Sequence, residues 1–181
     1  MSISFQARKP YISGSQWLPG NSGFTLVELM IVLAIAALLV IAAGPSYRAF
    51  VSSQRLDTAV NSYSLALRQA RSEAIKSNGN VHLCAPNASG SDCATGSSAS
   101  LSDGWLVVRQ IGTDTTVLAD SRGDVKGLQI STQTPKITFN RLGNPDPASA
   151  AIKFCANFFT DGKQVTLNAG GQPRQAPASC Q

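Results

Sequence analysis

The feature that most constrains this chain is an almost wholly apolar run near its N-terminus, residues 24–43. As a helix of about 20 residues it would extend about 30 Å, the thickness of the hydrocarbon core of a bilayer. Arg8 and Lys9 precede the run, so the positive-inside rule keeps the N-terminus cytoplasmic and exports everything after Gly44. An ordinary secretory signal peptide is the alternative, but the run is longer than a typical signal core and no small-x-small site closes it. The run therefore predicts one membrane anchor followed by an exported domain.

Glu28 is the single charged residue inside this run. An ionised carboxylate in hydrocarbon costs a few kcal/mol, so an intramembrane acid is by default a functional candidate. The run offers no Lys or Arg, so the counter-charge must come from another chain. A cut between Gly23 and Phe24 would create a free α-amino group four residues before Glu28, on the same face of the helix. This pattern predicts cleavage at that bond and an ion pair between subunits.

The sequence Gly23-Phe24-Thr25-Leu26-Val27-Glu28, followed by an apolar run, resembles the class III signal of type IV pilins and type II secretion pseudopilins. The resemblance implies that a prepilin peptidase cleaves after Gly23 and N-methylates Phe24, and that Glu28 sets register with a neighbouring subunit. Pro45 falls where pilins usually carry a helix-distorting proline. The resemblance divides the chain into a cleaved leader (1–23), a transmembrane helix (24–44) and a periplasmic domain (45–181), with a leader somewhat longer than most.

A second helical stretch is predicted from Ser46 to about Ser77 and is ended by Asn78-Gly79. Its apolar residues recur at steps of three and four, which gives one stripe suited to packing on a sheet: Leu56, Val60, Tyr63, Leu67, Ala70 and Ala74. Strand-like runs follow at 81–84, 105–110, 115–119, 128–131, 136–140, 151–156 and 164–168. Asp103-Gly104 and Asp161-Gly162 are typical of hairpin turns, and residues 85–103 and 144–147 are predicted loops. The predicted fold is α+β, a long N-terminal helix whose distal half packs on a largely antiparallel sheet.

All four cysteines, Cys84, Cys93, Cys155 and Cys180, follow the apolar run. An even number in the exported part indicates an oxidising compartment and two disulfides. Three pairings are possible, and we favour Cys84–Cys93 with Cys155–Cys180 because each encloses one turn-rich segment. Zinc is the weaker interpretation, because the spacing is wrong and His82 is the only histidine. No metal or other cofactor is expected.

Catalysis has little support in the sequence. We find no nucleophile elbow, metal-ligand cluster or phosphate loop, and the acidic residues stand singly. His82 lies within a predicted strand, which favours a structural role. Trp105 and Phe154, Phe158 and Phe159 are explained by core packing. The protein is therefore not expected to be an enzyme.

Two further stretches are similar to the GspH/FimT/FimU group of minor pilins and pseudopilins. They are Ala70-Arg71-Ser72-Glu73-Ala74-Ile75 with Gly104-Trp105, and the ending that contains Gly162-Lys163-Gln164-Val165, Gly170-Gly171-Gln172-Pro173-Arg174 and Cys180. The resemblance implies a minor pilin at or near the pilus tip that helps to initiate assembly. Its implied partners are major and other minor pilins, the prepilin peptidase and the inner-membrane assembly platform. A GspH-like pseudopilin of a type II secretion system is the alternative, and an anchored protein that never polymerises is the third interpretation.

DNA binding is the alternative from another class. FimT-like minor pilins that bind DNA carry a Gly-Arg-x-Arg motif near the C-terminus, and Gly171-Gln172-Pro173-Arg174 keeps only its second arginine. The candidate contacts are Arg174 and the distant Lys163. The formal net charge of +5 is low, and phosphate binding depends on the number of cations presented together. A solvated tail pinned by a disulfide is the favoured interpretation of this ending.

Overall fold

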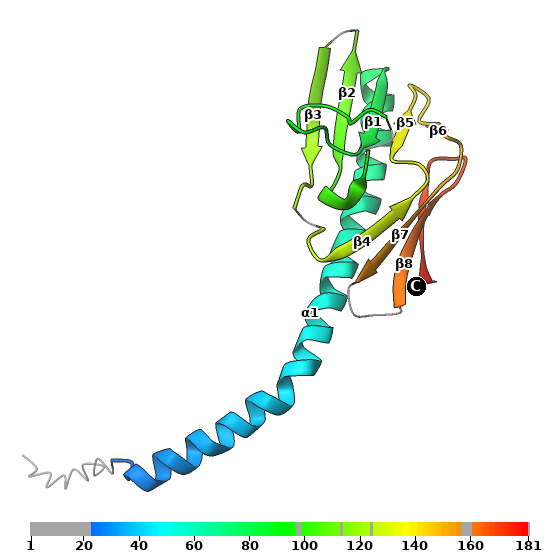
Figure 1. Cartoon of the computed structure of the whole chain (residues 1–181). Coiled ribbons are helices and arrows are strands. Elements are labelled where there is room, and N and C mark those ends of the chain that lie inside the picture. The colour runs from blue at the N-terminus through cyan, green and yellow to red at the C-terminus, as the bar shows by residue number, and fades with distance from the viewer. Residues whose placement is uncertain (1–22, 97–98, 113, 124, 157–160, 181) are drawn as a thin grey trace, which may run out of the picture. The chain divides into compact units, whose positions relative to one another are not determined.

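The computed structural model describes residues 23–180 except 97–98, 113, 124 and 157–160, and for residues 42–46 it describes the helical backbone without side chains. The chain divides into two compact units, Met1–Ala42 and Ala43–Gln181, which we describe separately. One long helix, α1 (Leu26–Ser77), contributes to both units (Figure 1). Within the residues whose side chains are described, no helix contains an apolar stretch long enough to cross a membrane.

The second unit is built on the distal part of α1. All six residues of the predicted stripe, from Leu56 to Ala74, are buried. The prediction of an amphipathic helix from the spacing of its apolar residues is therefore confirmed. The helix ends at Ser77, and Asn78 adopts a left-handed conformation with a φ of 51°. The amide of Gly79 then donates to the carbonyl of Ala74, so the predicted Asn-Gly end of the helix is confirmed.

Within the described residues, nine strands form two antiparallel sheets (Figure 1). The five-stranded sheet has the order β3-β2-β1-β5-β6, and the four-stranded sheet has the order β4-β7-β8-β9. A short 3₁₀ helix, η1 (Leu101–Asp103), precedes β2. The strands are β1 (Asn80–Cys84), β2 (Leu106–Ile111), β3 (Asp114–Asp120), β4 (Leu128–Thr132), β5 (Lys136–Phe139), β6 (Pro145–Asp146), β7 (Ala150–Ala156), β8 (Asp161–Leu167) and β9 (Pro173–Ser179).

The fold is α+β as predicted, with the strands divided between two sheets. All seven predicted strands are present, and β6 and β9 are additional. Two turn predictions are wrong: Asp103 ends η1, and Asp161-Gly162 begins strand β8. The predicted loop 144–147 contains β6, because Pro145 and Asp146 pair with Phe139 and Thr138. These errors arise because a turn dipeptide says nothing about the partner that the chain meets in space.

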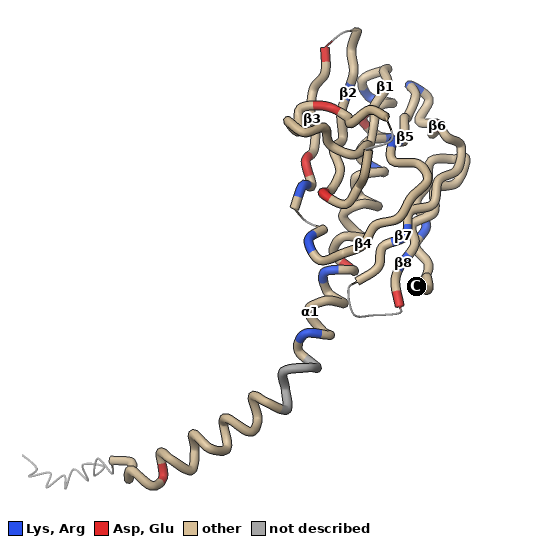
Figure 2. Tube along the Cα trace, in the orientation of Figure 1, with Lys and Arg blue, Asp and Glu red and all other residues tan. Residues whose placement is uncertain are grey.

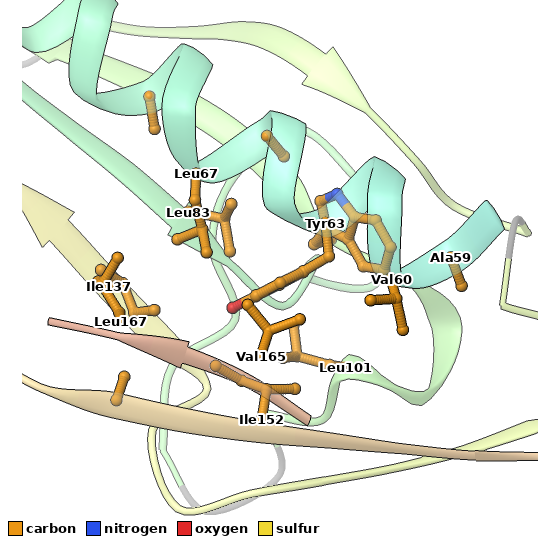
Figure 3. Close-up of a cluster of buried hydrophobic side chains, with 14 of the residues drawn as sticks. Ala59, Val60, Tyr63, Leu67, Leu83, Leu101, Ile137, Ile152, Val165 and Leu167 are labelled. Atoms are coloured by element: carbon orange, nitrogen blue, oxygen red, sulfur yellow. The ribbon is translucent and has the colours of Figure 1, made fainter. Parts of the chain in front are cut away.

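The main core joins the helix stripe to both sheets. Figure 3 shows Tyr63 and Leu67 of α1 facing Leu83 and Ile137 of the first sheet and Ile152 and Val165 of the second. The ring of Tyr63 meets Trp105 edge-on at 5.0 Å and lies 5.5 Å from Phe154, so these aromatics pack in the core, as expected. Phe158 and Phe159 lie outside the described residues. Every residue of this core falls between Leu56 and Leu167, so the second unit buries a core of its own.

A smaller cluster of Cys84, Leu106 and Val108 lies apart from the main core, with Cys93 packed against it. The loop that follows β1 supplies this cover: Ala94 donates to the carbonyl of Ala85 at 2.8 Å, and Pro86 and Cys93 form an isolated bridge. The loop predicted from its Ser, Gly and Ala content is therefore a packed element.

Candidate processing and assembly site

The candidate site is the start of α1. Gly23, Phe24 and Thr25 precede the helix, and all three are exposed. Phe24 is 78% exposed, so both the Gly23–Phe24 bond and the ring beside it are accessible. The bond predicted to be cut therefore lies before the first residue of α1.

Thr25 caps the helix. Its hydroxyl accepts the amide of Glu28 at 3.2 Å, and its carbonyl accepts the amide of Leu29 at 3.1 Å. An acid at Glu28 also lies in the first helical turn, where it interacts favourably with the helix dipole. Sequence reasoning missed the cap, although Thr25-Leu26-Val27-Glu28 has the spacing of a capping box. The hydroxyl and carbonyl of Thr25 thus fix where the helix begins.

Glu28 makes no ion pair among the described residues, and its side chain is exposed. Figure 2 shows a single acidic position in this part of the helix. The nearest basic residue along the described chain is Arg48, many turns away. The ion pair between subunits that the sequence analysis expects for Glu28 stays a prediction.

The apolar side chains of the first unit are exposed around the whole helix. Five consecutive residues, Leu29 to Leu33, are each more than half exposed, and consecutive residues point to every side of a helix. The others are Leu26, Val27, Ile35, Leu38, Leu39, Val40 and Ile41. A helix that is apolar on all sides requires lipid or neighbouring protein around it.

Two disulfides stabilise the second unit, and they join the pairs that the sequence analysis favours. Cys84 is bonded to Cys93 and Cys155 to Cys180. The second bond crosses strand β8 at Gly162, which pairs with Cys155 on one side and Ala178 on the other. A Cβ on Gly162 would meet both sulfur atoms and the carbonyl of Phe154, so only glycine fits under this bridge. The bond fixes β9 at the edge of its sheet.

The two candidate DNA contacts lie on opposite faces of the four-stranded sheet. Lys163 forms an ion pair with Asp57 of α1 at 2.7 Å and therefore faces the helix. Arg174 pairs with Thr166, whose neighbours Val165 and Leu167 are buried in the core, so Arg174 points away from the helix. The structure does not bring the two cations together. Their faces depend on strand register, which the sequence did not reveal because β9 was not predicted.

His82 is a structural residue. It is 8% exposed, and its two ring nitrogens lie 2.9 Å from the Thr138 hydroxyl and 3.2 Å from the Gln110 side-chain oxygen. Burial lowers its pKa below the ordinary value, with the hydrogen bond that the ring donates to the Gln110 side-chain oxygen opposing that effect. Among the described residues, no group of His, Cys, Asp or Glu is placed to hold a metal ion.

Comparison with known proteins shows the family to which the chain belongs. Residues 59–171 match the family model described as Type II transport protein GspH, and residues 18–44 match the prokaryotic N-terminal methylation motif. Two crystal structures of the type IV minor pilin FimU of Pseudomonas aeruginosa (strain PAO1) share the fold. One has a TM-score of 0.51 at 19% identity and covers 70% of this chain and 98% of that one. The other has a TM-score of 0.52 at 18% identity, and the match covers 73% of this chain and 97% of the FimU chain. No curated protein matches.

The matched GspH region extends from the middle of α1 to the turn before β9, and the methylation motif contains Gly23, Phe24 and Glu28. Together they span more than half of the chain. The chain belongs to the GspH family and is a pilin of the GspH/FimT/FimU type.

Proposed function

We propose that this chain is a minor pilin of a type IV pilus. The leader, residues 1–23, is removed by a prepilin peptidase, and the new N-terminal Phe24 is methylated. Residues 24–44 hold the subunit in the inner membrane with its globular domain, residues 45–181, in the periplasm. An inner-membrane assembly platform then transfers the subunit into the filament beside major and other minor pilins.

Glu28 carries this proposal. It is the one charge in an apolar helix start, it is exposed, and it makes no ion pair among the described residues. In a low-dielectric filament core an unpaired carboxylate is strongly unfavourable, so a subunit that offers it a cation gains affinity and register together. The amine of Phe24 on a neighbouring subunit is that cation.

Within the family we favour a priming or tip subunit similar to FimU. The structural likeness to a minor pilin along almost the whole of that chain supports this choice. The alternative is a GspH-like pseudopilin of a type II secretion system, which the family match favours equally. Deletion of the gene separates the two functions: loss of surface filaments supports the pilus, and loss of an exported enzyme with intact filaments supports the secretion system.

Replacement of Glu28 tests assembly directly. In Glu28→Ala the subunit should be processed and reach the inner membrane at its normal level, but its amount in sheared filaments should fall roughly tenfold or more, the effect of losing about 1.4 kcal/mol or more at one interface. Glu28→Asp keeps the charge and should retain part of the incorporation. Glu73→Ala removes a carboxylate that pairs with Arg109 inside the domain, and it serves as the matched control. Normal incorporation of the Glu28→Ala subunit would contradict the proposal.

Mass spectrometry of the membrane-purified chain tests the processing step. The expected N-terminus is Phe24 with one added methyl group. A Gly23→Leu variant should keep the leader, because the peptidase no longer finds its small residue. An intact leader in the unmodified chain, or a terminus elsewhere, would be evidence against a pilin.

A further inference from the structure

Two sheets have four edges, and three of these are protected against pairing with another chain. On β9, Pro173 and Pro177 remove two backbone donors. The edge strand β6 has only two residues and is flanked by Pro147. At β4 the helix η1 lies beside the strand. Proline, shortness and a covering segment are the devices by which natural sheets avoid unwanted partners.

The fourth edge, β3, has none of these features among the described residues. Strand β3 lies at the edge of its sheet (Figure 1). Its residues 114–117 are all exposed, and they include neither proline nor lysine. They pair with β2 in unbroken register, from Ile111 with Asp114 to Val108 with Val117. The register shift in this ladder begins directly after Val117, between Val108 and Val107 of β2, so residues 114–117 themselves are regularly paired. We name residues 114–117 the open edge.

The open edge has the chemistry of a strand that accepts another strand. Thr115, Thr116 and Val117 are β-branched and favour extended backbone. A strand paired on one side only presents a row of amide and carbonyl groups on the other, and an extended segment can satisfy them. Val117 itself and Ile111, which pairs with Asp114, are exposed and add apolar area at this edge.

The charges of β3 favour a different chain over a second copy of the same strand. The strand begins at Asp114 and ends at Asp120. If two copies paired antiparallel along their open edges, Asp114 would lie opposite Val117 of the other copy and gain no counter-charge, and parallel pairing would place the two Asp114 carboxylates beside each other. Like charges in cross-strand positions are destabilising. Asp120 is already held by Arg122 through an ion pair, so the acid that an incoming strand meets is Asp114.

We propose that the open edge receives an extended segment of a different pilin subunit, with a lysine or arginine of that segment opposite Asp114. The proposal rests on the assembly function above and names where one neighbour binds. It involves β3 in the second unit, so it is separate from the role of Glu28 at the start of α1.

Site-specific photo-crosslinking in cells tests this contact with the full chain. A benzophenone amino acid replaces the exposed Thr116, and the matched control carries it at the exposed Ala176 on the protected edge β9. The expected product is a cross-link from position 116, in sheared filaments, to a segment of another pilin that contains a basic residue next to the cross-linked site. Position 176 should give little product.

Charge reversal then tests the chemistry. Asp114→Lys should lower the yield from position 116 roughly fivefold, because an attractive cross-strand pair becomes a repulsive one. Asp161→Lys, a change of the same sign at an exposed position of β8, should leave the yield unchanged.

The outcomes separate this proposal from the proposed function. Incorporation into filaments without a cross-link at position 116 overturns the open edge and leaves the pilin function intact. A cross-linked homodimer overturns the choice of partner, and a yield that Asp114→Lys does not change overturns the charge contact. Absence of the chain from filaments, with a cross-link still formed in the membrane, contradicts the assembly function and supports the edge.

Discussion

At the scale of single residues, Tyr63 departs from the rule that buried polar groups are hydrogen-bonded. Its side chain is fully buried, and Figure 3 shows it extending from α1 among Val165 and Leu101. Its hydroxyl has no hydrogen-bond partner among the described residues. A buried hydroxyl without a partner loses its hydration and gains nothing in return. The aromatic ring, by contrast, packs edge-to-face against Trp105, so the ring and not the hydroxyl accounts for a tyrosine at this position.

Removal of that hydroxyl should not destabilise the domain. We predict that Tyr63→Phe leaves the free energy of unfolding at neutral pH unchanged or raises it by about 1 kcal/mol. Burial also raises the pKa of Tyr63 above its ordinary value. An unfolded tyrosine loses its proton near about pH 10, so this residue supports folding fully below that pH, and its support is lost as the pH rises further.

Urea unfolding of residues 46–181 at about pH 7, pH 9 and pH 11 checks both effects. The unmodified domain should lose more stability between the two alkaline values than Tyr63→Phe does. Tyr47→Phe removes a hydroxyl from an exposed tyrosine and should leave the alkaline loss as it is. A large destabilisation by Tyr63→Phe at neutral pH would mean that the hydroxyl has a partner.

At the scale of elements, Gly162 shows how one residue determines whether a strand can be fixed in place. Strand β9 carries two prolines and is mostly exposed, so its position depends on pairing with β8 and on the Cys155–Cys180 bond. That bond passes over Gly162. A Cβ there would lie 2.5 Å from the Phe154 carbonyl, and backbone cannot easily give way.

We predict that Gly162→Ala lowers the free energy of unfolding by about 1–3 kcal/mol, the usual effect of overpacking. A fraction of the chains should also retain free Cys155 and Cys180 thiols. Gly170→Ala is the matched control, because its nearest new contact is 3.5 Å away at the Asn168 side chain. Thermal unfolding measures the stability of the two variants, and a thiol assay measures their free cysteines. Equal stability and equal thiol content in the two variants would show that β8 can shift under the bridge.

The elements of this domain differ in how far the sequence alone predicts them. The stripe on α1 was readable because helical period and burial coincide within one segment, from Leu56 to Ala74. Strands β6 and β9 were not readable, because they contain proline and are defined by partners distant in sequence. The start of α1 was readable as a motif, whereas the cap at Thr25 was overlooked. The separation of Lys163 and Arg174 required strand register and the Asp57 contact.

At the scale of the whole molecule, the two units differ in whether their apolar side chains are buried within the chain itself. The second unit buries its apolar residues against its own sheets and carries both disulfides. The described side chains of the first unit remain exposed, so that unit is completed by lipid or by other subunits. The buried core of the domain and the exposed apolar segment therefore lie in separate parts of the chain.

This division predicts that residues 46–181, expressed alone in an oxidising compartment, form a soluble monomer with both disulfides. The fragment should unfold cooperatively, at a midpoint within about 4 °C of that of the mature chain in detergent, which corresponds to a difference of about 1 kcal/mol or less. Reduction of the disulfides should lower the midpoint of both forms in parallel, because closing the 25-residue Cys155–Cys180 loop is alone worth about 3.5 kcal/mol in chain entropy. Calorimetry of the two forms makes the comparison. An unfolded or aggregated fragment would mean that the apolar segment supports the domain core, whereas a matching midpoint would show that this segment adds nothing to the stability of the domain.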